Sequence, residues 1–185
     1  MNPLLLNFPD EFQTERLTIR APRPGDGPIF NAAVLDALEA CKPWMPWAKK
    51  APTVEESEEL MRPAHAKFVR REDLMFLVFL RETGTLVVSS GIHRAMWTTP
   101  RFEIGYWVRT PFAGRGYVTE AAAGLTEFAR TSLGAKRVEI RASDKNPRSW
   151  RIPEKLGLIY EGTLKNWTRA PAGELHDLRV YAKTF

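Results

Sequence analysis

An α/β fold, in which helices flank a central mixed sheet, is predicted by the order of apolar patterns along the 185 residues. Short segments that alternate or run apolar, as strands do, are interspersed with segments whose apolar residues recur at helical spacing. No internal repeat, low-complexity tract or long linker interrupts this order. Residues 1–185 are therefore expected to form a single domain.

The first half of the chain is expected to hold one strand and two helices. Residues 16–21 alternate apolar and polar side chains, which predicts a half-buried strand. A helix should start at residues 24–26, because Pro, Gly and Asp there precede an apolar face. Prolines interrupt residues 43–52, and Thr53 is expected to cap a second helix that reaches about Arg71.

The second half is richer in strands. Apolar runs at 74–80 and 86–92, joined by a Glu-Thr-Gly turn, predict a hairpin, and residues 102–108 predict a third strand beside it. The remaining elements are a helix from about Val118 to Leu133, a strand over 137–142, a short helix around 149–156 and strands near Leu158 and Val180.

Composition excludes several classes of protein. The single cysteine, Cys41, cannot form an internal disulfide and is expected to be a buried or incidental thiol in a reducing compartment. The three histidines lack metal-ligand spacing, so no metal is expected. The apolar run Leu4–Leu6 is too short for a signal peptide or a membrane span. We therefore expect a soluble, cytoplasmic protein without a membrane partner.

The charge is unevenly distributed. The formal net charge is +5, and residues 101–165 hold all of the excess, with 12 Lys and Arg against 7 Asp and Glu. A positive region of this kind suits a ligand with several negative charges. A nucleic acid would be attracted by the same field but is not the expected partner.

The most informative segment is 109–120, where a predicted strand is followed by a loop containing Gly114 and Gly116 and then by a helix. Such a loop lets backbone amides approach a ligand, and the start of the helix adds unpaired donors and a partial positive charge. We call residues 113–119 the glycine loop and expect it to bind phosphate. An ordinary strand-to-helix connection could use glycine in the same way, and the segment matches neither the dinucleotide fingerprint nor the P-loop.

Several short motifs follow one another in a recognisable order. They are Glu-Ile-Gly-Tyr-Trp-Val at 103–108, Gly-Arg-Gly-Tyr-Val-Thr-Glu-Ala at 114–121, Asn-Pro-Arg-Ser at 146–149, Glu-Lys-Leu-Gly-Leu at 154–158 and Tyr-Glu-Gly at 160–162. Together they resemble the GNAT superfamily of N-acetyltransferases, most closely its ribosomal-protein N-terminal (Rim-type) branch. Likenesses at 14–20, 42–47 and 176–181 extend the resemblance over nearly the whole chain. It implies a GNAT-like, mostly antiparallel arrangement of the mixed sheet.

The resemblance implies that acetyl-CoA is the cosubstrate and that amides from about Ala113 to Thr119 bind its pyrophosphate. Two positions depart from the family pattern. Ala113 lacks the usual polar side chain, which Arg109 or Arg115 could replace, and Val118 adds bulk where the ligand passes. The implied cofactor-binding residues are Trp107, Val108, Arg109, Ala113, Gly114, Arg115, Gly116, Tyr117, Val118, Thr119 and Asn146.

Glu103 is the candidate base, because it is the only carboxylate in 102–108 and shares a strand face with Gly105 and Trp107. An ammonium has no lone pair and must lose a proton before it attacks a thioester. A carboxylate beside apolar surface can have its pKa raised toward neutrality, which improves it as a base. Glu103 is also consistent with a solvated position on the sheet, but the resemblance favours the base.

The resemblance further implies that an amide near Val108 stabilises the oxyanion and that Ser149 protonates the leaving thiolate. Tyr160 is a second candidate acid, with a buried structural hydroxyl as the alternative. Trp44, Met45 and Trp47 could line the acceptor opening or simply anchor their proline-rich loop.

The predicted function is acetyl transfer from acetyl-CoA to a primary amine, and a protein or peptide α-amine is the expected acceptor. The alternatives are a small-molecule amine acetyltransferase and a noncatalytic CoA-binding or ribosome-associated module. The resemblance also makes a homodimer an expectation.

Overall fold

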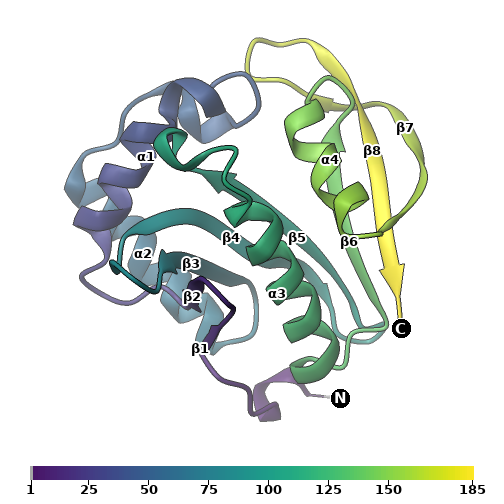
Figure 1. The fold of residues 1–185 in the computed structure, drawn as a ribbon, viewed down its shortest axis with the longest axis horizontal. Helices are drawn as coiled ribbons and strands as arrows, with labels where there is room; N and C mark the ends of the chain where they lie inside the picture. The colour runs from purple at the N-terminus through teal and green to yellow at the C-terminus, as the bar shows by residue number, and fades with distance from the viewer. Residues whose placement is uncertain (1) are drawn as a thin grey trace.

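The computed structural model describes residues 2–185, which build one eight-stranded sheet with helices on both faces (Figure 1). The strand order is β1-β2-β3-β4-β5-β6-β8-β7, and every neighbouring pair is antiparallel except β5 and β6. The strands are β1 (Glu11–Gln13), β2 (Leu17–Arg20), β3 (Leu74–Leu80), β4 (Leu86–Met96), β5 (Arg101–Val108), β6 (Arg137–Ser143), β7 (Ile159–Arg169) and β8 (Leu175–Thr184). The predicted mixed, mostly antiparallel sheet is confirmed.

Four α-helices and three short 3-10 helices complete the fold. The α-helices are α1 (Gly27–Cys41), α2 (Val54–Val69), α3 (Tyr117–Ser132) and α4 (Pro147–Lys155). The 3-10 helices are η1 (Pro3–Leu5), η2 (Pro46–Lys49) and η3 (Thr110–Phe112). In residues 2–185 no helix has the length and apolar character needed to cross a membrane.

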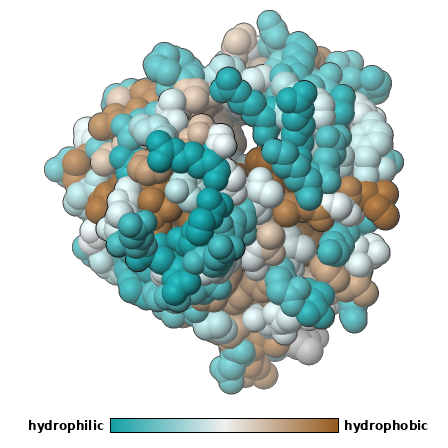
Figure 2. All heavy atoms as spheres, in the orientation of Figure 1, coloured by the Kyte–Doolittle hydropathy of each residue, from teal (hydrophilic) through white to brown (hydrophobic). Residues whose placement is uncertain are grey.

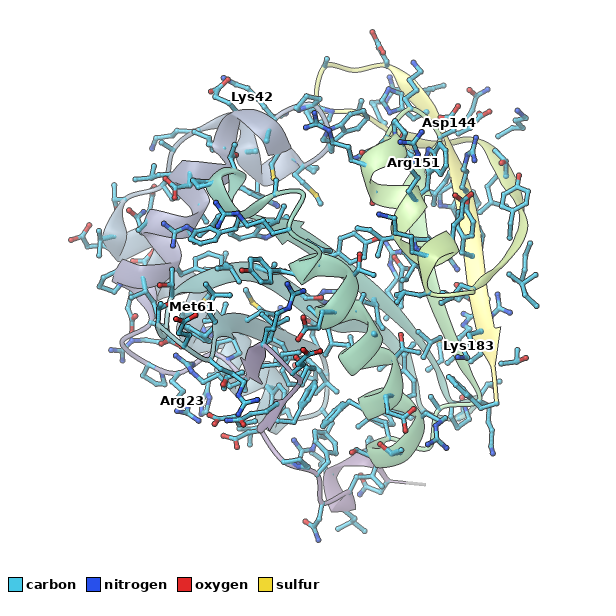
Figure 3. The ribbon with its side chains drawn as sticks, in the orientation of Figure 1. Arg23, Lys42, Met61, Asp144, Arg151 and Lys183 are labelled. Carbon is cyan, nitrogen blue, oxygen red and sulfur yellow. The ribbon has the colours of Figure 1, made fainter. Side chains whose placement is uncertain are left out.

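The core has two layers because the middle strands are apolar on both faces. In β3, Phe76 and Val78 pack on the α3 side, whereas Leu77 and Phe79 pack on the side of α1 and α2. Figure 1 shows α3 crossing in front of β4 and β5. Met61 of α2 is fully buried in the opposite layer (Figure 3). This double burial explains the continuous apolar runs of the sequence.

Local hydrogen bonds fix the two helices of the second layer. Thr53 caps α2 as predicted, because its hydroxyl accepts the Glu56 amide and the Glu56 carboxylate accepts the Thr53 amide. The buried side chain of Asn31, in α1, donates to the carbonyl oxygens of Pro52 and Thr53 at 2.8 and 2.9 Å. These bonds hold the start of α2 against α1 and position the wall of the cavity described below.

The predicted element order is confirmed, with differences at element ends. Strand β1 and helix η1 were not predicted, because three-residue elements leave no periodic pattern. Strand β4 continues to Met96, and a bulge between His93 and Met96 interrupts its pairing with β5. Helix α4 begins at Pro147 and not near Ser149, since Asn146 caps it and accepts the Ser149 amide at 3.2 Å.

Candidate active site

The glycine loop has the backbone conformation that an anion site requires. Gly114 and Gly116 have φ of 76° and 82°, a region that favours glycine, and Gly116 is the N-cap of α3. The Glu120 amide is the first to bond within the helix, to the carbonyl oxygen of Gly116 at 3.0 Å. Within residues 2–185, the preceding amides of the first helical turn, at 117–119, therefore have no backbone acceptor.

An ion-pair network attaches the glycine loop to the first hairpin. The Glu120 carboxylate accepts from the Thr14 hydroxyl at 2.6 Å and from the amide and Nε of Arg16 at 2.8 and 2.6 Å. Burial of Glu120 works against its ionisation, but these hydrogen bonds prevail and hold the pKa of Glu120 below its ordinary value. Arg16 also donates to the carbonyl oxygen of Arg115 at 3.2 Å. The loop is thereby held rigidly for a ligand.

The side chains around the loop differ from expectation in two respects. Arg109 turns to α1, where it binds the Asp36 carboxylate at 2.7 and 3.0 Å and the Leu86 carbonyl oxygen, so its charge is already neutralised. Arg115 makes no ion pair with any residue of the 2–185 range, which leaves it as the cation beside the glycine loop. The side chain of Val118 packs against the core, so its bulk is directed inward.

Beyond Glu103, β5 and β6 separate. Their parallel pairing covers only 101–103 and 137–139, although β5 continues to Val108 and β6 to Ser143. We call the region between 104–108 and 140–143 the β5–β6 split. In Figure 2 the surface is hollowed between the half that carries α1 and the half that carries α4.

Backbone amides line the β5 side of the split. The Arg109 amide donates to the Val87 carbonyl oxygen at 3.0 Å, which makes Val88 and Val108 a non-hydrogen-bonded pair. The Val108 amide consequently points away from β4 and into the split. By strand alternation the amides of Ile104 and Tyr106 do the same. An extended chain carrying amides of its own could therefore pair with this edge.

Tyr106 and Pro153 connect the two sides of the split. Proline at 153 cannot donate to the carbonyl oxygen of Ser149, four residues earlier in α4. The Tyr106 hydroxyl donates to that oxygen instead, at 2.9 Å. Burial raises the pKa of the Tyr106 phenol, so the hydroxyl keeps its proton. This hydrogen bond holds α4 beside the end of β5.

The polar residues predicted near the thiol lie at the start of α4. Asn146 uses its side-chain oxygen to cap the helix, and Ser149 follows within the first turn. Arg151 and Asp144 lie near the same end of α4 (Figure 3). A second serine, Ser143, ends β6 and hydrogen-bonds Nδ1 of the buried His176 at 3.0 Å.

Glu103 is not in the apolar setting that we expected. Its carboxylate is bound by Arg94 at 2.6 and 2.7 Å, and Arg141 approaches it to 3.4 Å. The side chain is 17% exposed and does not line the cavity beside it. Arg94 can reach Glu103 because it occupies the bulge of β4 with a φ of 49°. Sequence could not reveal this pairing, since the bulge turns an outward residue toward its neighbour.

An apolar cavity of about 470 Å³ lies between β4, β5 and the helices α1 and α2. Met45 and Trp47 form part of its wall, and their place at an acceptor opening stays a prediction. Trp107 also faces this cavity and contacts Trp47, with ring centroids 5.4 Å apart. Trp44 instead lies 6.1 Å from the His176 ring and so connects the loop after α1 to β8. The side chain of Trp107 therefore lines a second site, on the face of the sheet opposite to α3.

His93 lines this cavity, Asp73 binds its ring from behind, and both residues were missed from the sequence. Nδ1 of His93 is 2.7 Å from the Asp73 carboxylate, and His93 lines the cavity. The available signal was a pair of glycines, Gly91 and Gly105, within otherwise apolar strands. Glycine inside a strand indicates that another group approaches the backbone closely.

Three further expectations can be compared with the structure. The alternative that Tyr160 is buried is wrong, because it is 50% exposed on the edge strand β7 and bonds Thr163. Cys41 is buried as predicted, and burial raises the pKa of its thiol to about 11. Among residues 2–185, no group of three or more His, Cys, Asp or Glu side chains is arranged to hold a metal ion.

Comparison with known proteins identifies the family. A family model described as an acetyltransferase (GNAT) domain matches residues 16–159. The chain belongs to the GNAT acetyltransferase family. The GNAT match contains the sheet from β2 to β6, the glycine loop and α4, and with them every predicted site residue except Tyr160. The chain is accordingly an acyltransferase by family, which confirms the resemblance seen in its motifs.

Named GNAT relatives come from bacteria. YdaF of Bacillus subtilis, provisionally named a ribosomal N-acetyltransferase, is 27% identical over 169 residues, which cover 91% of each protein. Among solved structures, the ribosomal L7/L12 α-N-protein acetyltransferase RimL in complex with coenzyme A is 20% identical with a TM-score of 0.83, covering 93% of this chain and 96% of RimL.

A third GNAT structure is that of MccE, the microcin C7 self-immunity acetyltransferase, in complex with acetyl-CoA and AMP. It is 18% identical, has a TM-score of 0.86, and the match covers 96% of this chain and 98% of MccE. At these identities the two solved structures support the GNAT fold of the chain.

Proposed function

We propose that this protein transfers the acetyl group of acetyl-CoA to a primary amine. The observation that carries the proposal is the glycine loop at the edge of the β5–β6 split. The loop offers unpaired amides beside Arg115, which suit a diphosphate. The split offers the amides of residues 104–108, which suit the two amide groups of pantetheine. Both solved structures described above hold CoA or acetyl-CoA on the same fold.

The residues of this chain would then act on the two sides of the thioester. The Val108 amide is aimed into the split, where it can stabilise the oxyanion of a tetrahedral intermediate. Ser149, at the start of α4, is the proposed donor of a proton to the leaving thiolate. Tyr160 is less suitable as the acid, because β8 and β6 separate its strand from the split. On the acceptor side, the resemblance implied Glu103 as the base, but Arg94 and Arg141 already bind its carboxylate.

We further propose that the amine enters through the apolar cavity on the opposite face of the sheet from α3. Its walls are aromatic and aliphatic, so it favours an amine whose adjoining group is apolar. The α-amine of a protein or peptide is the first candidate acceptor, in line with the names of YdaF and RimL. A small-molecule amine is the second, since a cavity of about 470 Å³ can enclose one. A cytoplasmic location and a homodimer remain predictions.

The proposal is tested by calorimetry and by turnover. Acetyl-CoA is titrated into the protein, and thiol release is then followed with peptides starting in Ser, Ala, Met or Phe and with small apolar amines. We expect binding heat, amine-dependent thiol release and a product heavier by one acetyl group. Binding of acetyl-CoA without turnover on any amine would favour the noncatalytic CoA-binding module. Salt-sensitive RNA binding without turnover would favour the ribosome-associated module.

A further inference from the structure

The imidazole of His93 lies on the sheet at a place that two glycines keep open. A Cβ added at Gly91 would come within 2.5 Å of Cε1 and Nε2 of His93. A Cβ added at Gly105, which pairs with Gly91 across β4 and β5, would lie 3.3 Å from the ring. Any side chain at 91 would thus displace the imidazole. The ring forms part of the cavity floor, where a bound amine would meet it.

Asp73 fixes the orientation and tautomer of this ring. Its carboxylate oxygen lies 2.7 Å from Nδ1 of His93, so it accepts the Nδ1 proton. Nε2 then carries the lone pair, and no hydrogen-bond partner for Nε2 exists among residues 2–185. The side chains of His93 and Asp73 are 36% and 35% exposed, which leaves a route for protons to solvent. An aspartate that orients a histidine in this way also stabilises the imidazolium when a proton arrives.

The ring also borders the stretch of β5 that would hold pantetheine. Gly105 lies between Ile104 and Tyr106, whose amides point into the β5–β6 split. His93 is therefore one residue from the backbone that would hold pantetheine, but on the cavity side. Glu103 is the direct cross-strand neighbour of His93, yet its carboxylate is occupied by Arg94 and Arg141.

Four charged groups bear on the protonation of His93 from the surrounding elements. Asp73 precedes β3 and touches the ring, Glu103 comes from β5, and Arg94 follows His93 in β4. Glu56 of α2 lines the same cavity, and its carboxylate is bound by the Thr53 amide and lies 3.6 Å from Lys50. Tyr106 also borders the cavity, but its hydroxyl is bonded to the Ser149 carbonyl oxygen of α4. Of these groups, only Asp73 touches the imidazole through a hydrogen bond.

We propose that His93, oriented by Asp73, accepts the proton of the amine that enters the cavity, an inference that rests on the proposed acetyltransferase function. An ammonium gives one proton to Nε2 of His93, and its freed lone pair forms the C–N bond to the thioester carbonyl. The tetrahedral intermediate expels the thiolate as the C–S bond breaks, and the second nitrogen proton ends on the thiol. The imidazolium of His93 releases its proton to solvent. Glu103 then positions Arg94 and Arg141 and is not the base.

The test compares His93→Gln, Asp73→Asn and Glu103→Gln in the intact protein, with His65→Gln as the matched control. His65 lies on α2, bonds the Pro22 carbonyl oxygen through Nδ1 and does not line the cavity. Acetyl-CoA affinity by calorimetry and Tm verify folding. The pH dependence of kcat/KM is measured with an amine that the wild type acetylates.

We expect His93→Gln to lower kcat/KM by about 100-fold or more and to abolish its acid limb, with acetyl-CoA affinity unchanged. Asp73→Asn should cost about tenfold, and His65→Gln should keep the wild-type profile. Glu103→Gln should keep the acid limb, because in this account the limb belongs to His93. Imidazole should restore activity to His93→Ala.

A wild-type pH profile in His93→Gln, or loss of the acid limb in Glu103→Gln alone, would overturn the inference and leave the proposed function intact. Absence of wild-type turnover with every amine would instead overturn the proposed function. If His93→Gln fails to fold, the Asp73→Asn profile decides, because that substitution keeps an acceptor for Nδ1 and removes only the charge.

Discussion

The hydrogen bond from Tyr106 to Ser149 predicts that the stability of this protein depends jointly on Tyr106 and Pro153. In Tyr106→Phe, the Ser149 carbonyl oxygen loses its donor at 2.9 Å, and Pro153 cannot supply another. Leaving this part-buried acceptor unpaired costs about 1–2 kcal/mol of unfolding free energy. For a chain of this length, Tm should fall by roughly 2–4 °C per kcal/mol.

The same change should cost much less in a Pro153→Ala background. The alanine amide can donate to the Ser149 carbonyl oxygen within α4, so Phe at 106 would leave no acceptor unpaired. A double-mutant cycle in urea should give a coupling energy of about 1 kcal/mol or more. Tyr160→Phe is the control, because its half-exposed hydroxyl bonds only Thr163 and its loss should cost less than about 0.5 kcal/mol. Equal costs of Tyr106→Phe in the two backgrounds would refute the reasoning.

Three further predictions concern the glycine loop and a buried ion pair. Gly116→Ala, at a φ of 82°, should lower the unfolding free energy in urea by about 1–2 kcal/mol, and an unchanged midpoint would contradict the conformation described. Arg115→Ala should weaken acetyl-CoA binding more at low salt than at high salt and leave Tm unchanged. Arg109→Ala should instead lower Tm, because it loses the Asp36 pair. Calorimetry at two ionic strengths that found the salt-dependent loss of binding in Arg109→Ala and not in Arg115→Ala would contradict this assignment. Burial works against ionisation of Asp26, but hydrogen bonds from Arg20 and Arg23 prevail and keep the pKa of Asp26 below 3.8. The ionised carboxylate therefore stabilises the fold fully above pH 3.8. This stabilisation is lost as the pH falls through the lowered pKa. Asp26→Asn should therefore cost about 2 kcal/mol at pH 7 and progressively less below pH 4, and a pH-independent cost in thermal melts would be inconsistent with this pairing.

The element order and the glycine loop could be predicted because both depend on local signals. Apolar periodicity marks β3 and α3, and the two positive-φ glycines mark the turn before α3. The family resemblance added the mostly antiparallel arrangement of the sheet. These features follow from residues close together in the chain or from motifs that occur in a set order.

The partners of the charged site residues could not be predicted, because they come from distant segments. Asp36, which neutralises Arg109, is on α1, and Arg141, which approaches Glu103, is on β6. The bulge that directs Arg94 to Glu103 has no signature in the sequence. The pairing of His93 with Asp73 depends on how β3 and β4 align, and only the facing glycines beneath the ring hinted at it.

Pro153 shows how a local rule can be correct and still mislead. Proline lacks a backbone donor, and the sequence predicted this helix only around 149–156. The helix begins at Pro147 all the same, because Asn146 caps it and Tyr106 supplies the donor that proline lacks. The compensating group comes from β5, and only the folded arrangement brings it there.

A crystal structure of the complex with acetyl-CoA tests the central claim most directly. The account predicts that the diphosphate oxygens lie about 2.7–3.2 Å from amides of residues 116–119, with pantetheine extended along β5 in the β5–β6 split. A complex in which the diphosphate lies elsewhere, for example in the apolar cavity beside Trp107, while the glycine-loop amides face water, would contradict it.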